Sequence, residues 1–458
     1  MENKIFKVMV MYEDILTEAI NEFWRIGMPD DLIERDIFSL SELFVSPRKV
    51  IVITGLRRVG KTYVIFQLIK QLLGEIPRER IYYLNFEDER IPREKEVLSA
   101  FTSIMRAKLE NLSNALIFLD EIHKIPEWSR WLFRVYEREK PVIVVTGSSS
   151  ELSAWNLPRE LRGRALTYRL FPLRFREFIR FKHGEEQLVL DEWSRVRVLQ
   201  LLDEYLRYGG MPEVVLSPVQ RKLRILQDYY WTIITRDIAE SQGIENLSIL
   251  NTVLKYVTNT VYFSASRLHN ILKSAGYRIG KNTILDYVSY AEKAYFITQL
   301  PQYHERASQK IIAPRKIYLG DVGFLTALAT KKIVKGRLFE NLVFLELQRR
   351  YYHDPTIEIS YLSLKDGEVD FVVSRGLDIL ELVQVCYDPT DIETKQREVL
   401  SLVKALRAFR IKRGIIITAN YEDREVYGTR EITYIPYIKW ECRIGELDPH
   451  RNNPYSIP

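Results

Sequence analysis

The residues best suited to chemistry stand at the end of one apolar run, where glycine, lysine and threonine follow a fixed spacing. Residues 50–53 are β-branched and apolar, as a buried parallel strand requires. This run leads into Gly55-x-x-x-x-Gly60-Lys61-Thr62, and an apolar segment with helical periodicity follows. A strand, a glycine-rich loop and a helix in this order are typical of a loop that binds phosphate groups. We therefore expect this chain to bind a nucleoside triphosphate.

Each part of this loop has an expected role. The glycines let the backbone curl around a phosphate, and the free amide groups and the helix N-terminus place positive partial charge against it. Lys61 would reach the β- and γ-phosphate oxygens, and the Thr62 hydroxyl would bind Mg²⁺. The predicted cofactors are therefore ATP and Mg²⁺. The predicted nucleotide-binding residues are Gly55, Leu56, Arg57, Arg58, Val59, Gly60, Lys61, Thr62 and Tyr63.

Two carboxylates follow a second apolar run. Residues 115–119 are apolar and end in Asp120 and Glu121. Such acids alone fit a solvated strand end equally well, but together with the phosphate loop they indicate the hydrolytic half of an ATPase. Asp120 would hold Mg²⁺ through water, and Glu121 would act as general base on the attacking water.

Two further segments offer candidate catalytic groups. Residues 142–146 predict a strand beside that of Asp120, and Ser148 or Ser149 after it fits either a hydrogen bond to the γ-phosphate or a helix N-cap. Arg162 and Arg164 flank a glycine in a later loop. Either arginine could stabilise transition-state charge, including across a subunit boundary, and an ordinary surface loop fits equally well.

Composition limits the classes of protein to which the chain can belong. With 458 residues, 46% of them hydrophobic, two to four globular domains are expected. Lys and Arg exceed Asp and Glu by 67 − 61 = 6, which permits a polyanionic partner without requiring one. The two cysteines, Cys386 and Cys442, are too few for a disulfide framework or a zinc site. This cysteine content fits a reducing compartment, so we expect a cytoplasmic protein, and no apolar run approaches the ~20 residues of a membrane span.

Several motifs together resemble one family, the prokaryotic AAA+-type ATPases that are abundant in archaea. The resemblance is carried by the loop at 55–62, Asn85-Phe-Glu-Asp88, Leu119-Asp-Glu-Ile-His123, Thr146-Gly-Ser-Ser-Ser150, Gly163-Arg164, and the segments 171–178 and 208–213. It implies a P-loop fold with an additional strand, Glu121 as catalytic acid/base, Ser148 as a sensor position, and a ring or other homo-oligomer. In that family the ATPase core is fused to a C-terminal domain related to restriction-endonuclease-like nucleases.

The expected fold class is therefore a multidomain α/β protein with a P-loop AAA+-type parallel sheet. The expected parts are a helical lead-in at 1–48, the ATPase core at 49–180, a helical lid or linker at 181–245, a winged helix-turn-helix at 246–330, and a degenerate PD-(D/E)xK-like domain at 331–458.

The segment 246–330 has the size and rhythm of a winged helix-turn-helix. Basic and amide residues would stand at the start of its recognition helix and in its wing, as docking to a DNA groove needs. The alternative is that this three-helix unit only links domains. The candidate DNA contacts are Arg278, Lys281, Asn282, Arg306 and Lys310.

The C-terminal segment resembles the PD-(D/E)xK arrangement with one part missing. Glu340 is expected on a helix, Asp370 on a strand and Gln384 on the next strand, where carboxylates would gather Mg²⁺. The lysine of that motif is replaced by Cys386, whose thiol cannot stand in for an ammonium. Lys395 on the following helix is a conceivable substitute. An inactive nuclease fold that serves DNA binding or assembly is favoured over an active nuclease.

Three functions follow from these observations. The main hypothesis is a Mg²⁺-dependent ATPase that binds and remodels DNA, with branched DNA in recombination or repair as one substrate. The second is a nucleotide-switched regulator or defence scaffold that acts on a protein partner. The third is an ATP-dependent nuclease, against which the missing lysine argues.

Overall fold

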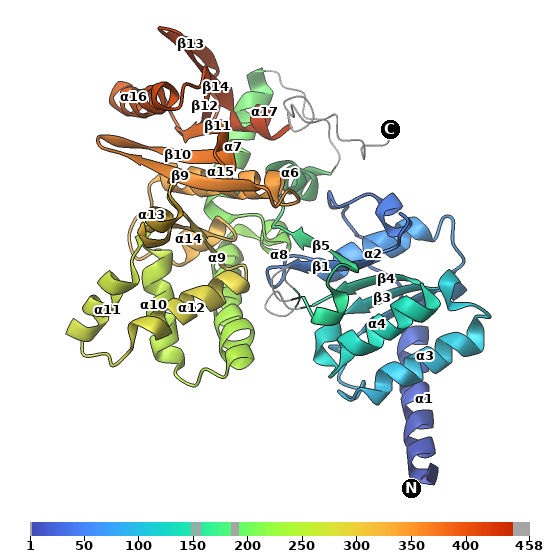
Figure 1. Ribbon diagram of the computed structural model, residues 1–458. Helices are drawn as coiled ribbons and strands as arrows, with labels where there is room; N and C mark the ends of the chain where they lie inside the picture. The colour runs from blue at the N-terminus through green and yellow to red at the C-terminus, as the bar shows by residue number, and fades with distance from the viewer. Residues whose placement is uncertain (1, 148–151, 153–156, 185–191, 443–458) are drawn as a thin grey trace. The chain divides into compact units, whose positions relative to one another are not determined.

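The computed structural model describes residues 2–147, 152, 157–184 and 192–442 (Figure 1). The chain divides into two compact units, Met1–Phe171 and Pro172–Pro458. Each unit is considered by itself.

The first unit is built on a five-stranded parallel sheet with the strand order β2-β3-β4-β1-β5. The inner strands are continuous apolar runs because helices cover both faces of the sheet. The order confirms the prediction that residues 142–146 lie beside the Asp120 strand. The strands are β1 (Val50–Gly55), β2 (Ile81–Asn85), β3 (Leu116–Asp120), β4 (Val142–Thr146) and β5 (Ala165–Leu170).

Helices lie on both faces of this sheet, with α2 on one face and α3 and α4 on the other (Figure 1). The buried side chains of Tyr12, Leu16 and Ile20 join α1 to the core that contains α3 and α4. Of the predicted helical lead-in at 1–48, Glu2–Ile26 is α-helix and Leu40–Leu43 is a short 3-10 helix. The helices are α1 (Glu2–Ile26), η1 (Leu40–Leu43), α2 (Lys61–Leu72), η2 (Arg78–Arg80), α3 (Glu96–Lys108), η3 (Leu112–Asn114), η4 (Ile122–Lys124), α4 (Trp128–Glu139) and η5 (Arg159–Leu161).

The second unit begins with helices and then alternates helices with a small antiparallel sheet of order β6-β8-β7. The opening helices are α6 (Phe175–His183), α7 (Glu192–Tyr208), α8 (Pro212–Leu216), α9 (Val219–Thr232) and the π-helix η6 (Ile233–Glu240). The alternating elements are α10 (Leu247–Thr258), β6 (Tyr262–Phe263), α11 (Ala265–Ser274), α12 (Lys281–Lys293), β7 (Ile297–Leu300), α13 (Ala307–Ile312), β8 (Arg315–Leu319) and α14 (Gly323–Ala327).

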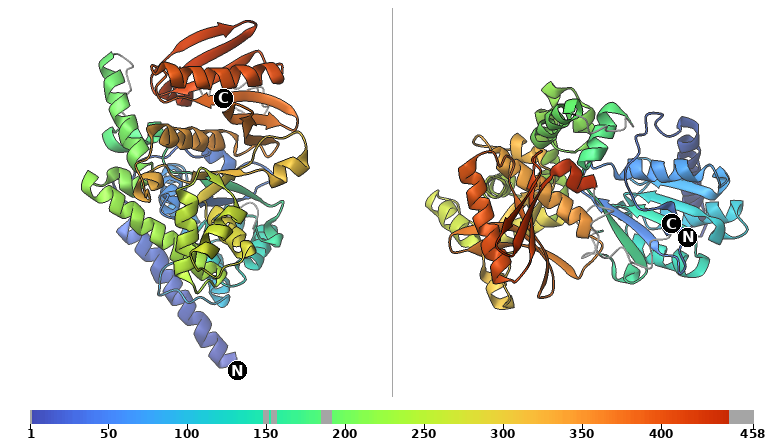
Figure 2. Two further views of the ribbon diagram at one scale, coloured as in Figure 1. Left: turned by 90° about the vertical axis from the view of Figure 1, so that its left-hand side faces the viewer. Right: turned by 90° about the horizontal axis from the view of Figure 1, so that it is seen from above.

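The remainder of the second unit forms a mixed six-stranded sheet of order β13-β14-β12-β11-β10-β9. Helix α16 packs along this sheet (Figure 2). The elements are α15 (Lys335–Tyr351), β9 (Ile357–Leu364), β10 (Gly367–Arg375), β11 (Asp378–Val385), α16 (Ile392–Ala408), β12 (Arg413–Thr418), β13 (Asp423–Tyr427), β14 (Arg430–Pro436) and α17 (Tyr437–Cys442).

Candidate functional site

The phosphate loop lies where the sequence predicts it, between the end of β1 and the start of α2. Gly60, which precedes α2, has a φ of 100°, in the left-handed region that favours glycine. A Cβ on Gly55 would stand 2.4 Å from the carbonyl oxygen of Leu170. Leu56 and Val59 are buried, so only their backbone can face a ligand. The two glycines therefore let the chain turn closely against β5 and enter the helix.

The side chains of the phosphate loop and of the two acids converge at the carboxyl ends of β1 and β3, where Tyr83 of β2 joins them. The Thr62 hydroxyl donates to Asp120 Oδ2 at 2.6 Å, and Tyr83 donates to the same oxygen at 3.4 Å. Lys61 Nζ lies 3.9 Å from Glu121 Oε1. The sequence separates the loop from the two acids, and the parallel sheet brings them together because its strands end at one edge.

A threonine at the end of β4 organises both acids, and the candidate residues proposed from sequence omit it. The Thr146 hydroxyl donates to Asp120 Oδ1 and accepts the backbone N–H of Glu121 at 3.0 Å. Glu121 has a φ of 53°, in the left-handed region that non-glycine residues rarely adopt. Its Oε2 lies 3.4 Å from His123 Nδ1.

Burial dominates the electrostatics of this site. It raises the pKa of Asp120, which hydrogen bonds from Thr146 and Thr62 oppose, and it raises the pKa of Glu121, which the Lys61 ammonium opposes. Burial and nearby cations lower the pKa of His123 to about 3, so its imidazole is neutral near pH 7. A carboxylate whose pKa is raised is a stronger base, which is what Glu121 needs to accept a proton from water.

The oxygens present fit the Mg²⁺ ion that a phosphate loop implies. The Thr62 hydroxyl and the Asp120 carboxylate are hard oxygen ligands that lie within hydrogen-bonding distance of each other. These two groups would hold the ion against the phosphates, directly or through water.

Arg35 supports the loop from outside any recognised motif. Its side chain is 6% exposed, and it donates to the Val59 carbonyl at 3.0 Å and to the Phe171 carbonyl at 2.8 Å. Its backbone also exchanges two hydrogen bonds with the amide of Gln67 on α2. The sequence does not predict this role, because a single arginine in a polar stretch belongs to no motif.

The remaining catalytic candidates do not join the phosphate loop within the described structure. Ser148 and Ser149 lie outside the described residues. Arg164 donates to Glu137 at 2.6 Å and precedes β5, at the end of the sheet opposite the loop. The two ends of the six-residue strand β1 are five residue steps apart, roughly 17 Å. Arg164 therefore cannot serve the loop of its own chain in this position.

A second cluster of carboxylates lies in the second unit, and a lysine occupies its centre. Lys316 Nζ lies 2.8 Å from Glu340 Oε1 and 3.5 Å from Asp370 Oδ1, and it also pairs with Glu368. Lys316 is 2% exposed. Tyr318 donates to Glu340 at 2.5 Å. This arrangement does not fit a Mg²⁺ ion among these acids, because the ammonium already stands where the cation would bind.

The sequence analysis therefore predicted the acids of this cluster but not Lys316, the lysine that pairs with them. Gln384 accepts the backbone N–H of Asp370 at 3.2 Å and donates to Glu398, so its carbonyl does not face the other carboxylates. The suggested substitute, Lys395, pairs instead with Glu425 at 2.6 Å. Lys316 comes from β8, a strand of the preceding segment, and no spacing rule links it to the acids.

The candidate DNA contacts lie on the helices before this cluster. Arg278 stands between α11 and α12, Lys281 and Asn282 begin α12, and these three side chains are exposed. Arg306 is exposed at the start of α13. Lys310 forms an ion pair with Glu358 on β9, so it is less available than the others.

Comparisons with known proteins agree with the phosphate site. A family model described as an AAA domain matches residues 47–179. Two domains of unknown function, DUF8612 and DUF4143, match residues 199–333 and 335–438. The uncharacterized protein MJ1544 of Methanocaldococcus jannaschii is 30% identical over 453 residues, which cover 95% of this chain and 98% of that protein. The chain belongs to the MJ1544 family.

The chain is also similar to a further sequence relative and, more distantly, to solved structures. An uncharacterized protein of Haemophilus influenzae is 29% identical over 394 residues, covering 85% of this chain and 93% of its own. The Walker-type ATPase PABY2304 of Pyrococcus abyssi is 14% identical, with a TM-score of 0.46 over 66% of this chain and 99% of its own. The Aeropyrum pernix ORC1 protein, solved in complex with DNA, is 15% identical, with a TM-score of 0.31 over 66% and 94%.

In the described part of the chain, no helix has both the length and the apolar character that a membrane span needs.

Proposed function

We propose that this member of the MJ1544 family hydrolyses ATP at the loop 55–62 and uses the energy to act on DNA. The observation that carries the first half is the convergence of Lys61, Thr62, Asp120 and Glu121 at one edge of the parallel sheet. The AAA domain match over residues 47–179 supports it.

The proposed hydrolysis assigns one task to each residue. Lys61 neutralises charge on the β- and γ-phosphates, while Thr62 and Asp120 hold the Mg²⁺ ion, which offsets the charge that develops on the phosphate oxygens. Glu121 accepts a proton from the water that attacks the γ-phosphorus. Thr146 keeps both acids in place through its two hydrogen bonds.

Support for DNA as the target comes from residues 246–330. The order α10, β6, α11, α12, β7 and β8, with the sheet β6-β8-β7, fits a winged helix-turn-helix in which the short helix α13 stands between β7 and β8. The exposed side chains of Arg278, Lys281 and Asn282 stand at the start of α12, where a recognition helix contacts DNA. They form no hydrogen bond or ion pair with other described residues, so they are available to phosphates and bases.

The C-terminal domain enters this proposal as a retained nuclease-like fold without nuclease activity. Lys316 pairs with Glu340, Glu368 and Asp370 at the position that a metal ion would take. The proposed oligomer, such as a ring, would give Arg164 a role only at the loop of a neighbouring subunit.

The test is steady-state ATP hydrolysis without DNA and with single-stranded, duplex and four-way-junction DNA, each at two salt concentrations. We expect one DNA structure to stimulate turnover and the stimulation to fade with salt, since phosphate contacts release counterions. A Lys61→Ala variant should lose turnover and keep its DNA affinity. A rate of ATP hydrolysis that none of these DNAs changes would overturn the proposed action on DNA. It would favour a nucleotide-switched regulator of a protein partner.

A further inference from the structure

The phosphate loop carries two arginines besides its lysine, and the proposed hydrolysis assigns no task to either. Arg57 and Arg58 stand between Leu56 and Val59. The backbone N–H of Val59 donates to the carbonyl of Leu56 at 3.2 Å. The four residues therefore form a hydrogen-bonded β-turn, and the two arginines occupy its corners.

The surroundings of this turn fix its backbone. The side chains of Leu56 and Val59 are buried, and Arg35 donates to the carbonyl of Val59 at 3.0 Å. Arg58 has a φ of 65°, a left-handed conformation that persists in a non-glycine residue only where the surrounding structure imposes it. Arg57 is partly exposed and Arg58 is exposed, so the turn presents its arginine side chains to a ligand.

Arg57 lies on the side of the loop that faces the catalytic groups. Burial raises the pKa of Glu121, and the positive charges of Lys61 and Arg57 oppose this rise. Burial lowers the pKa of His123, and nearby cations that include Arg57 lower it further. Because the effect of a charge fades with distance, the Arg57 guanidinium is close to both groups. Glu121 itself lies 3.9 Å from Lys61 Nζ and 3.4 Å from His123 Nδ1, so these four residues form one cluster.

A cation in this cluster would face the γ-phosphate of bound ATP. The backbone amide groups of the loop and Lys61 determine where the phosphates lie, and Glu121 faces the water that attacks the γ-phosphorus. An arginine at this position raises the rate of phosphoryl transfer by about 10³–10⁵-fold in P-loop enzymes, because it stabilises charge in the transition state. Arg164 cannot supply this charge to its own chain, since it stands at the opposite end of the sheet.

We propose that Arg57 is a catalytic residue that contacts the γ-phosphate of the ATP bound to its own chain and stabilises the transition state. This inference rests on the proposed ATPase activity. In the step, the water oxygen bonds to the γ-phosphorus while the bond to the β–γ bridging oxygen breaks, and ADP leaves with the electron pair of that bond. Glu121 takes a proton from the water. Arg57 donates to a γ-phosphate oxygen, so no arginine from a neighbouring subunit is needed.

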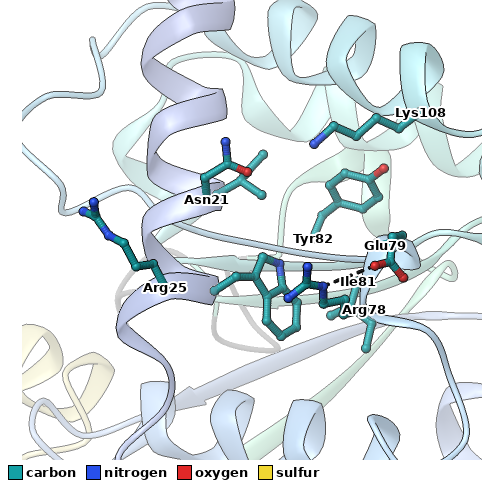
Figure 3. A pocket seen from close by; sticks show the side chains of 9 residues that line it. Asn21, Arg25, Arg78, Glu79, Ile81, Tyr82 and Lys108 are labelled. Carbon is teal, nitrogen blue, oxygen red and sulfur yellow. Dashed lines mark hydrogen bonds and ion pairs between the residues drawn. The ribbon is translucent and has the colours of Figure 1, made fainter.

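Single-turnover hydrolysis of ATP by Arg57→Gln tests this role. The amide removes the charge, so we expect hydrolysis slower by about 10³-fold or more, with the Kd for ADP changed by less than about threefold, because ADP lacks the γ-phosphate. The matched control is Arg78→Gln, which removes an arginine next to Glu79 before β2, at the opposite end of the sheet from the loop (Figure 3). It should hydrolyse ATP as the wild type does.

Binding of ADP with aluminium fluoride separates a contact with the reacting phosphate from an indirect effect. This complex imitates the γ-phosphoryl group in the transition state, and Arg57→Gln should weaken its binding by at least about 100-fold. Slow hydrolysis with unchanged affinity for the complex would show that Arg57 acts only through Glu121, and it would overturn the proposed contact.

A mixture of Arg57→Gln and Glu121→Gln tests whether the arginine serves its own chain. Each chain then carries one defect in its own site, so we expect no gain over either variant alone. Restored hydrolysis in the mixture would place the arginine at a neighbour's loop and overturn the proposal. Hydrolysis by Arg57→Gln at the wild-type rate would overturn this inference alone. A wild type that does not hydrolyse ATP would overturn the proposed function, and this inference with it.

Discussion

At the scale of single residues, the ammonium of Lys316 determines what the carboxylates around it can do. Because it is buried among Glu340, Glu368 and Asp370, removing it leaves three acids facing one another. We expect Lys316→Met to lower the free energy of unfolding by about 3 kcal/mol, as for other broken buried ion pairs. Urea denaturation measures this. Lys335→Met, which breaks an exposed pair with Asp203, should change it by less than about 1 kcal/mol.

The same variant tests whether the ammonium replaces a metal ion. Mn²⁺ should raise the urea midpoint of Lys316→Met more than that of the wild type, because only the variant presents the acids without a cation. Equal shifts in the two proteins, or Mg²⁺-dependent DNA cleavage by the wild type, would contradict this account.

Arg35 is the second residue at this scale, and its loss should affect both the stability of the fold and ATP binding. Arg35→Ala would leave the buried carbonyls of Val59 and Phe171 without these hydrogen bonds, at a cost of about 2 kcal/mol or more. Since Val59 belongs to the phosphate loop, we also expect weaker ATP binding, measured by calorimetry. Arg48→Ala removes two similar hydrogen bonds at the other end of the sheet and should leave ATP affinity unchanged. Equal losses of affinity in both variants would contradict a specific role for Arg35.

At the scale of elements, Asp321 joins the turn after β8 to the segment before α8. It accepts the backbone N–H groups of Gly210 at 2.7 Å and Gly323 at 2.8 Å. Burial raises its pKa from 3.8 to about 6. The folded protein thus holds a proton that the unfolded chain releases, and this contribution to stability is complete below pH 3.8 and lost as the pH rises through 6.

Replacing this carboxyl by an amide should remove that pH dependence. The stability of the wild type relative to Asp321→Asn should fall by about 3 kcal/mol between pH 4 and pH 7. Urea unfolding at four pH values measures both proteins, with the exposed Asp228→Asn as control, which should follow the wild type. Parallel curves for wild type and Asp321→Asn would contradict the assignment.

Burial explains part of the difference between the strands that sequence predicted and those that it missed. The strands β1, β3 and β4 are fully buried, and their apolar runs are visible in the sequence. The predictions missed β5, β6, β8, β13 and β14, of which β5 and β13 are edge strands with mixed exposure, while β8 and β14 are inner strands. Half-exposed edge strands need no apolar run, so composition does not mark them.

The residues of the candidate sites also fall into those that the sequence predicted and those that it missed. Lys61, Thr62, Asp120 and Glu121 were predictable because a phosphate site needs these residue types at the ends of neighbouring strands. Arg35 and Lys316 reach their partners through tertiary contacts between segments far apart in the chain, which no local spacing encodes.

At the scale of the whole molecule, the chain folds as two compact units, while the division into five parts stays a prediction. The proposed DNA contacts lie in the second unit. We expect the double variant Arg278→Glu and Lys281→Glu to weaken DNA binding at least tenfold and to reduce its salt dependence. Fluorescence anisotropy with labelled duplex DNA measures both. Lys332→Glu, an exposed lysine elsewhere in this unit, is the control; equal weakening in both proteins would show a nonspecific charge effect.

The central claim, that the groups around Glu121 hydrolyse ATP, is tested most directly by ATP affinity and single-turnover hydrolysis of Glu121→Gln. The amide keeps the shape of the side chain but cannot accept the proton, so we predict hydrolysis slower by about 10²-fold or more and ATP affinity close to that of the wild type. Glu79→Gln, an exposed change at the other end of the sheet, should behave as the wild type does. Hydrolysis by Glu121→Gln at the wild-type rate would contradict the account.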